Sequence, residues 1–378
     1  MRTANWTIKS KRQKNKLNDN RRRYIFLFLK TFLITSFSLI SLIVAVGGIS
    51  FYGTIRPPDI PTIPTTSENE IFAASLAHNS HIPIEEGENT PIGSGLIAPE
   101  GFTAEDRRDL FFTFLIVGLN EGTNANTIMV ASYDGINKEA NLVSIPRDSL
   151  INVNRGVRKL SGAYMTGTLR GGGVAGGVAQ MQREVMSIIG FVPDFYVIIN
   201  YDAFHAIIDA VGGIEIDVPF HMRYDDPFQN LHIDIPPGTQ LMDGETALHF
   251  ARFRNSNRGF RAINDYQRIE NQQTVVNATL ASLLRPANIL RIPEFIDIFN
   301  ENVHTNLTLG NMLWFASQLN EVRGSDVLST YTAPTTGTSG APMWYELLDG
   351  PGIVELVNRT INPYEIDIGL WDLNIISR

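Results

Sequence analysis

Hydrophobic residues divide the chain of 378 residues into segments of different character. Residues 24–46 are almost wholly apolar, and a run of this length can cross the ~30 Å hydrocarbon core of a bilayer. A cleaved signal peptide is the rival interpretation, but its apolar region would be shorter, about 7–15 residues. Residues 1–23 carry nine Lys and Arg residues against one acid. Because basic flanks stay inside, we predict a single-pass signal-anchor helix in the cell membrane, a cytoplasmic N-terminus and an extracellular remainder.

The rest of the chain separates into a spacer and a domain. Residues 47–105 are rich in Pro, Thr, Ser, Gly and Glu, a composition that buries too little to fold alone. We therefore predict an extracellular spacer there. Segments with regular hydrophobic periodicity follow, and we place a globular domain at residues 106–322. Residues 323–378 are predicted to extend the same domain with a strand and a helix.

Within the domain, periodicity predicts strands and helices in alternation. Phe111 to Leu119 is a continuous apolar run, typical of a strand buried on both faces. Further strands are predicted at 127–133, 141–145, 195–199 and 214–218, a hairpin within 222–235, a last strand from Tyr331, and helices at 178–189, 202–211, 265–284, 292–299, 308–322 and up to 359. We expect Asp202, Asp265 and Thr308 to cap helices, Gly190 to end one, and residues 336–341 to form a turn. The pattern favours a layered α/β domain.

Arginines concentrate in one stretch of this domain. Residues 250–273 hold five of them: Arg252, Arg254, Arg258, Arg261 and Arg268. Arg252 and Arg254 alternate with apolar residues, which predicts a strand carrying both guanidinium groups on one face. Arg268 and Gln272, four residues apart on the following helix, point the same way. Planar cations at a strand end and a helix start suit phosphate oxygens, whereas a solvated charge run is the alternative.

Two other segments add cations to the candidate site. Pro146 ends the third strand, because proline cannot donate to a sheet, and so Arg147 is presented at a strand end. Lys159 precedes a glycine-rich stretch, residues 167–177. This stretch matches neither a P-loop nor a dinucleotide fingerprint, so a flexible lead-in to the next helix competes with a phosphate cradle.

Charge and composition narrow the class of function. The formal charge is −8, but residues 1–54 hold ten of the 31 Lys and Arg residues and one of the 39 acids, which leaves about −17 outside the membrane. An arginine cluster in so acidic a domain is a local exception. The chain has no cysteine, so no disulfide holds the domain. No nucleophile motif, zinc motif or nucleic-acid-binding domain is present, and guanidinium groups without covalent machinery suit phosphoryl transfer.

Several motifs, in order and at the expected spacing, resemble the LytR-CpsA-Psr family. They are SIPRD (Ser144 to Asp148), YDDP with the following L-x-I (Tyr224 to Ile233), G-x-Q-L-x-x-G-E-x-A (Gly238 to Ala247), R-F-R (Arg252 to Arg254) and D-x-x-R-x-x-x-Q-Q (Asp265 to Gln273). The resemblance covers residues 106–322, behind the membrane anchor that such proteins carry. It implies a three-layer α/β/α domain with a central mixed sheet.

The resemblance also implies an activity. Such enzymes move a glycan phosphate from a polyprenyl-pyrophosphate lipid onto peptidoglycan, and so attach teichoic acid or capsular polysaccharide to Gram-positive walls. Its implied catalytic residues are Arg147, Arg252, Arg254, Arg268 and Asp265, with Gln272, Lys159 and Arg261 binding the substrate. The lipid tail would lie between sheet and helices, lined by strands near 197–199 and 214–218, although a solid core predicts the same apolar pattern.

One departure from the family pattern concerns Mg²⁺. The family places aspartates after the first strand and at the start of the second, where this chain has Asn120 and Asn126, with Glu121 beside them. Magnesium is usually held by carboxylates and phosphate oxygens, so binding should be weaker. Either Glu121 and substrate phosphates still hold the ion, or the protein binds lipid-linked glycan without turnover, as a scaffold or regulator. A third alternative is a transcription attenuator. It would need a cytoplasmic effector domain, which 23 cytoplasmic residues do not supply.

Overall fold

The computed structural model describes residues 56–59, 99, 102–121, 123–228, 231–257, 259–289, 291, 295, 298–299, 301–319, 327–340 and 343–376. Contacts divide the chain into Met1–Arg56 and Pro57–Arg378, and the second unit holds the fold. The predicted tail (1–23) and membrane segment (24–46) lie outside the described residues, as does most of the spacer. Among the helices that are described, none is long and apolar enough to span a bilayer.

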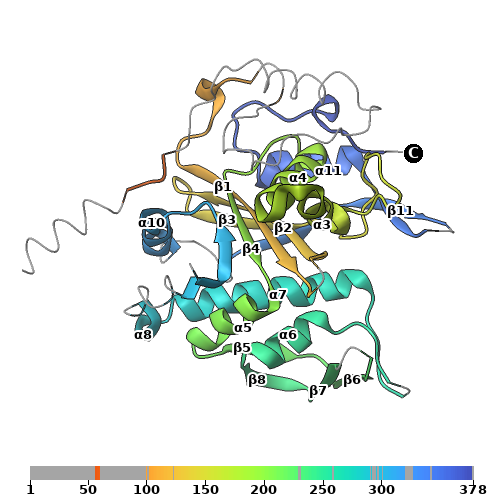
Figure 1. Ribbon diagram of the computed structural model, residues 1–378. Helices are drawn as coiled ribbons and strands as arrows, with labels where there is room; N and C mark the ends of the chain where they lie inside the picture. The colour runs from red at the N-terminus through yellow and green to blue at the C-terminus, as the bar shows by residue number, and fades with distance from the viewer. Residues whose placement is uncertain are drawn as a thin grey trace, which may run out of the picture. The chain divides into compact units, whose positions relative to one another are not determined.

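A six-stranded mixed sheet forms the centre of the domain (Figure 1). Its order is β10-β3-β2-β1-β4-β9. The strands are β1 (Phe111–Leu119), β2 (Ala125–Asp134), β3 (Glu139–Ser144), β4 (Phe195–Ile199), β9 (Val303–Thr305) and β10 (Ser329–Thr332). β1 is parallel to β4 and β10 to β3, whereas the other neighbours are antiparallel. The predicted central mixed sheet is therefore confirmed.

Helices cover both faces of this sheet, which gives three layers (Figure 1). On one face, α4 (Gly173–Ile189) and α11 (Gly350–Thr360) pack against Leu115 and Val117 of β1. On the other, α5 (Tyr201–Ala210), α7 (Asp265–Leu283) and α10 (Leu309–Leu319) face Phe114 and Ile116. Successive strand residues point to opposite faces, so a strand covered on both sides is apolar throughout.

A second apolar core lies beyond α5 and α7. It joins α6 (Gly244–Arg252) to two antiparallel strand pairs, β5 (Ile214–Val218) with β8 (Gly238–Met242), and β6 (Met222–Asp226) with β7 (Leu231–Ile235). The predicted hairpin within 222–235 is thus confirmed. The structure adds β8, which the sequence pattern left without an assignment.

The glycine-rich stretch is helical, so the expectation of a flexible lead-in before the helix is wrong. α3 (Ala163–Gly167) leads through a π-helical turn, η3 (Thr168–Gly172), into α4. A Cβ on Gly167 would lie 2.0 Å from the carbonyl oxygen of Gly176, and one on Gly177 would lie 2.7 Å from Thr168 Oγ1. These glycines therefore allow α3 and α4 to pack closely, which explains their presence without a ligand.

Helix caps were predicted with mixed success. Gly190, with φ of 85°, ends α4 as expected, and Thr308 accepts from Asn311 N at the start of α10. Asp202 and Asp265, however, lie inside the first turns of α5 and α7. Asn200 and Asn264 are the capping residues, and Asn264 forms a capping box with Gln267. The N-cap needs an extended backbone, which the tertiary path gives to the asparagine in each case.

The C-terminal segment also differs from the prediction. Residues predicted as a turn form β11 (Thr335–Ser339), which pairs with β12 (Tyr345–Leu348). α11 follows with Pro351 in its first turn, as expected. The short elements are η1 (Ala104–Asp106), η2 (Leu160–Gly162), α8 (Pro286–Ile289) and η4 (Leu370–Asp372). The predicted helix at 292–299 falls largely outside the described residues.

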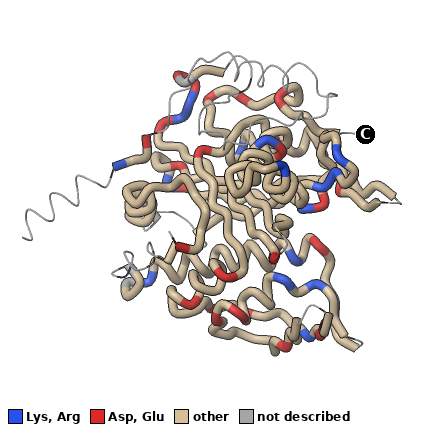
Figure 2. The backbone as a smooth tube through the Cα atoms, in the orientation of Figure 1, with Lys and Arg blue, Asp and Glu red and all other residues tan. Residues whose placement is uncertain are grey.

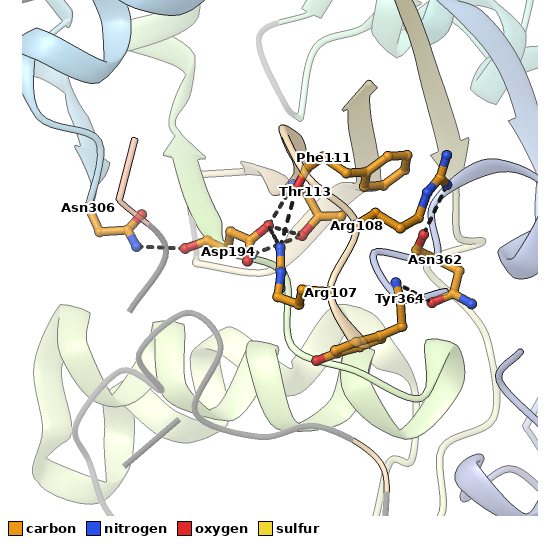
Figure 3. A network of polar contacts seen from close by, with 8 residues as sticks. All are labelled: Arg107, Arg108, Phe111, Thr113, Asp194, Asn306, Asn362 and Tyr364. Carbon is orange, nitrogen blue, oxygen red and sulfur yellow. Dashed lines mark hydrogen bonds and ion pairs between the residues drawn. The ribbon is translucent and has the colours of Figure 1, made fainter. Parts of the chain in front are cut away.

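A buried ion pair lies near the starts of the two central parallel strands, β1 and β4 (Figure 3). Asp194, just before β4, accepts hydrogen bonds from Arg107 Nη2 and from both N and Oγ1 of Thr113 on β1, each at 2.8 Å. Burial raises the pKa of the adjacent Tyr364 to about 12. The network lies near the start of β1, whereas the candidate site described next lies near the ends of β3 and β4. It is therefore structural.

Candidate anion-binding site

The first arm of the site begins where β3 ends. Arg147 Nη1 donates to Asn126 Oδ1 at 3.0 Å, and Asn126 Nδ2 donates to the Tyr201 hydroxyl at 3.3 Å. The guanidinium of Arg252 lies over the Tyr201 ring, 4.9 Å from its centroid. Two arginines that are 105 positions apart in the sequence are thus joined through one asparagine and one tyrosine.

The second arm is the first turn of α7. Arg268 Nη2 lies 2.7 Å from Asp265 Oδ1, and Arg254 Nε lies 3.9 Å from the same oxygen. Arg268 is 6% exposed, whereas the side chain of Arg254 is 48% exposed. Asp265 therefore orients one buried and one accessible guanidinium group.

The two arms of the site interact electrostatically, because the charge of Arg147 in the first arm acts on Arg268 in the second. Burial, followed by the positive charge of Arg147, lowers the pKa of Arg268 to about 10; Arg254 contributes to this lowering, and the negative charge of Asp265 opposes it. The Nε atoms of Arg147 and Arg268 are buried and have no hydrogen-bond partner in the described part of the chain. Crowded cations with unused donors form a site that an oxyanion would stabilise. Figure 2 shows basic positions gathered between the β11 hairpin and the α6–α7 connection.

Arg252 and Arg254 do not form the predicted strand. Arg252 is the last residue of α6, and Phe253, which is fully buried, ends the helix with an extended backbone. The two guanidinium groups consequently have different partners, Tyr201 and Asp265. The prediction that they share one face of a strand is wrong, because the alternation A-R-F-R is also compatible with a helix end.

The other predicted substrate-binding residues lie on three different segments and do not share a partner among the described residues. Lys159 Nζ lies 3.0 Å from Asp148 Oδ1. Asp148 directly follows Arg147, so this ion pair connects Lys159 to the residue next to Arg147. Gln272 is buried one turn beyond Arg268 on α7. Arg261 stacks over Phe220, 4.6 Å from the ring centroid, on the side of the second core. Arg258 lies outside the described residues.

The residues at the predicted metal position do not suit Mg²⁺. Asn120 Oδ1 accepts from Asn124 N at 2.9 Å, and Asn126 Oδ1 accepts from Arg147. Glu121 is exposed and is the one carboxylate of the three. Across the residues described, no group of three His, Cys, Asp or Glu side chains has metal-binding geometry. A hard dication prefers several anionic oxygens, and here the amide oxygens already accept protein hydrogen bonds.

An apolar cavity of about 430 Å³ lies between the sheet and the helices of the second face. Its lining is almost entirely apolar and includes Val197 and Ile199 of β4, as expected. The predicted contribution of 214–218 is wrong, since that strand packs into the second core. α7 carries Arg268 and Gln272 in its first turns and then lines the cavity through Val275, Val276, Thr279 and Leu280. α5 likewise runs from Tyr201 to Phe204, Ile207 and Ile208 on the cavity wall.

Comparison with known proteins identifies the family of the chain. The family model of the LytR_cpsA_psr family matches residues 100–361. The chain belongs to the LytR-CpsA-Psr family. The match is longer than the predicted segment 106–322 and includes α11, so much of the C-terminal segment is part of the family domain.

Two curated relatives and one solved structure illustrate the range of the family. The polyisoprenyl-teichoic acid–peptidoglycan teichoic acid transferase TagV of Bacillus subtilis is 26% identical over 209 residues, 52% of this chain and 50% of TagV. The regulatory protein MsrR of Staphylococcus aureus is 24% identical over 213 residues, 54% of this chain and 59% of MsrR. This LytR-CpsA-Psr chain thus spans about half the length of these relatives. The crystal structure of B. subtilis TagV shares the fold, with a TM-score of 0.54 and 23% identity over 66% of this chain and 95% of that one.

Three residues of this family member contact the site but were given no role from the sequence. Tyr201 connects Asn126 with Arg252, Asp148 pairs with Lys159, and Tyr266 follows Asp265 on α7 and contacts the β11–β12 hairpin. Asp148 lies in the SIPRD motif and was within reach of sequence reasoning. Nothing local distinguishes Tyr201 or Tyr266, because their partners are distant in sequence.

Proposed function

We propose that this protein is a membrane-anchored extracellular phosphotransferase that moves a glycan phosphate from a polyprenyl-pyrophosphate carrier onto peptidoglycan. The observation that carries the proposal is the adjacency of the cation cluster and the apolar cavity along α5 and α7. Each helix begins at the cations and continues along the cavity wall. A ligand that suits both has a diphosphate head and a hydrocarbon tail.

The charged head supplies the anion that the arginines lack. Arg268 and Arg147 repel each other in the folded protein, and two phosphate groups placed between them would relieve this repulsion. Arg252 and Arg254 approach from the α6 end of the site. Asp265 holds Arg254 and Arg268 while contributing one negative charge against several positive ones. The set therefore favours a dianionic or more highly charged ligand.

The proposed reaction is a displacement at phosphorus. A hydroxyl oxygen of the acceptor glycan attacks the phosphorus bonded to the donor glycan, and the bond from that phosphorus to the bridging oxygen breaks. The bridging oxygen leaves with the polyprenyl phosphate, the acceptor gains a phosphodiester, and the hydroxyl proton passes to a base. Negative charge develops on the bridging and equatorial oxygens, where guanidinium donors stabilise it.

The location of the protein is part of the proposal. The basic N-terminal segment and the apolar run 24–46 support a cytoplasmic N-terminus, and the absence of cysteine is compatible with a domain outside the cell. A reporter that is active only outside the membrane, fused after residue 378, should be active, whereas an active cytoplasmic reporter there would contradict the orientation.

The activity is tested with the full chain in detergent. The donor is a prenyl-pyrophosphate-linked N-acetylglucosamine, and the acceptor is uncrosslinked peptidoglycan. We expect acceptor-dependent release of prenyl phosphate, measured by mass spectrometry, together with label on the acceptor. Binding of the donor without release would support a second candidate function, a protein that holds lipid-linked glycan without turnover, which the neutral Asn120 and Asn126 favour.

A further inference from the structure

Glu346 of β12 contacts both the segment that follows Arg147 and the first turn of α7, in a part of the chain to which the sequence pattern assigns no function. Its backbone N donates to Asp148 O at 3.0 Å, and its carbonyl accepts from Leu150 N at 2.9 Å. Glu346 is thereby attached as a parallel bridge to the segment that directly follows Arg147. The position of its Cα relative to Arg147 is fixed by the backbone.

The side chain of Glu346 reaches the other arm of the site. Its Oε2 accepts a hydrogen bond from the Tyr266 hydroxyl at 3.4 Å, and that hydroxyl lies 2.6 Å from Thr335 Oγ1 on β11. Tyr266 directly follows Asp265, the partner of Arg268. The carboxyl group is therefore held between the end of β3 and the first turn of α7, the two elements that supply Arg147 and Arg268.

The charges around Glu346 distinguish it from the other acids of the site. Asp265 pairs with Arg268, and Asp148 pairs with Lys159. In the described part of the chain, Glu346 is paired with neither Lys nor Arg and accepts from a tyrosine hydroxyl instead. Burial raises the pKa of its carboxyl, the carboxylates of Asp265 and Asp148 raise it further, and the hydrogen bond from Tyr266 lowers it. A half-buried carboxylate with a raised pKa and no cation partner is a better proton acceptor than an ordinary glutamate.

We propose that Glu346 is the general base that takes the proton of the acceptor hydroxyl, and that Tyr266 and Thr335 orient its carboxylate. The inference rests on the proposed function and adds the acceptor side to it. The hydroxyl oxygen forms its bond to phosphorus as its proton moves to Glu346 Oε, and the proton later passes to solvent. A base with a raised pKa suits this step, because the best catalytic pKa lies near the working pH.

The test compares Glu346→Gln with the wild type in the transfer assay above, over a range of pH. We expect acceptor-dependent release to fall by about a hundredfold or more. The wild-type rate should fall at acid pH as Glu346 takes a proton, and this acidic limb should be absent in the variant. Binding of the prenyl-pyrophosphate donor, measured by calorimetry, should stay within about twofold, because the carboxylate does not contact the diphosphate. Glu355→Gln on the exposed face of α11 is the matched control and should leave rate and pH profile unchanged.

Tyr266→Phe gives an independent readout that does not depend on the stability of the first variant. Loss of its hydrogen bond removes an interaction that lowers the pKa of Glu346, so the acidic limb should move to higher pH. If Glu346→Gln transfers as fast as the wild type, or if its acidic limb is unchanged, Glu346 is not the base. If the wild type binds donor and releases no prenyl phosphate, the proposed transferase and the base are both overturned.

Discussion

Asn126 accepts a hydrogen bond from Arg147 at 3.0 Å, so the residue at the expected metal position holds a cation instead. A neutral amide allows this contact without neutralising the guanidinium, which keeps the full charge of Arg147 available to a phosphate. Its second partner, Tyr201, extends the same contact towards Arg252. The substitution of asparagine for aspartate thus changes what the position can bind.

The first prediction concerns magnesium. Replacing both Asn120 and Asn126 by Asp supplies two carboxylates near Glu121, and we expect the double variant to bind Mg²⁺ measurably by calorimetry, whereas the wild type binds at least about tenfold more weakly. Asn154→Asp, on an exposed loop, is the charge control. If the double variant is active and binds Mg²⁺ but turns over no faster than the wild type, a metal does not limit the rate. Equal Mg²⁺ binding by wild type and double variant would show that the amides are adequate ligands.

The second prediction concerns Arg268. Inorganic diphosphate should raise the thermal stability of the wild type, by about 2.7 kcal/mol at a hundred times its Kd. Arg268→Met should lose most of this gain, and transfer should fall by about a hundredfold or more. Arg359→Met on α11 removes an exposed arginine and should behave as the wild type. A full diphosphate response in the Arg268 variant would place the anion elsewhere.

The third prediction tests whether the cavity binds the hydrocarbon tail of the ligand independently of its diphosphate head. Val276 lines the cavity on α7, two turns beyond Arg268, and a tryptophan there should fill part of the space. We expect Val276→Trp to weaken binding of the prenyl-linked donor by about tenfold or more while leaving the diphosphate response unchanged. Val174→Trp, at a 43% exposed position on the opposite helical layer, is the control. Unchanged donor binding would mean that the cavity does not hold the tail.

The fourth prediction concerns His249 on α6 and the stability of the domain. Burial lowers the pKa of His249 below its ordinary value of 6.5. The unfolded chain therefore binds a proton at this position at higher pH than the folded chain, so stability falls as pH falls through 6.5, until the folded histidine also protonates. Urea unfolding at pH 7.5 and 5.5 should show a smaller loss for His249→Gln than for the wild type. His304→Gln, at an exposed histidine, should match the wild type; an equal loss in all three proteins would contradict the assignment.

Local hydrophobic periodicity determined much of the fold. β1, β4, β5 and α7 lie close to their predicted bounds, and α4 ends where predicted, because apolar spacing follows directly from the face that an element buries. The position of Arg147 just after a strand and the spacing of Arg268 and Gln272 by one turn on α7 follow from the same local rules. These features depend on residues within a few positions of one another.

Contacts between distant segments decided the rest. The A-R-F-R stretch ends a helix because Phe250 and Phe253 both pack into the second core, which its local pattern cannot reveal. The residues predicted as a turn form β11 because β12 pairs with them. Glu346 contacts Tyr266 although 80 positions separate the two residues. Charge interactions depend on separation in space, so the sequence determined which cations are present, and the tertiary structure alone determined which of them share one site.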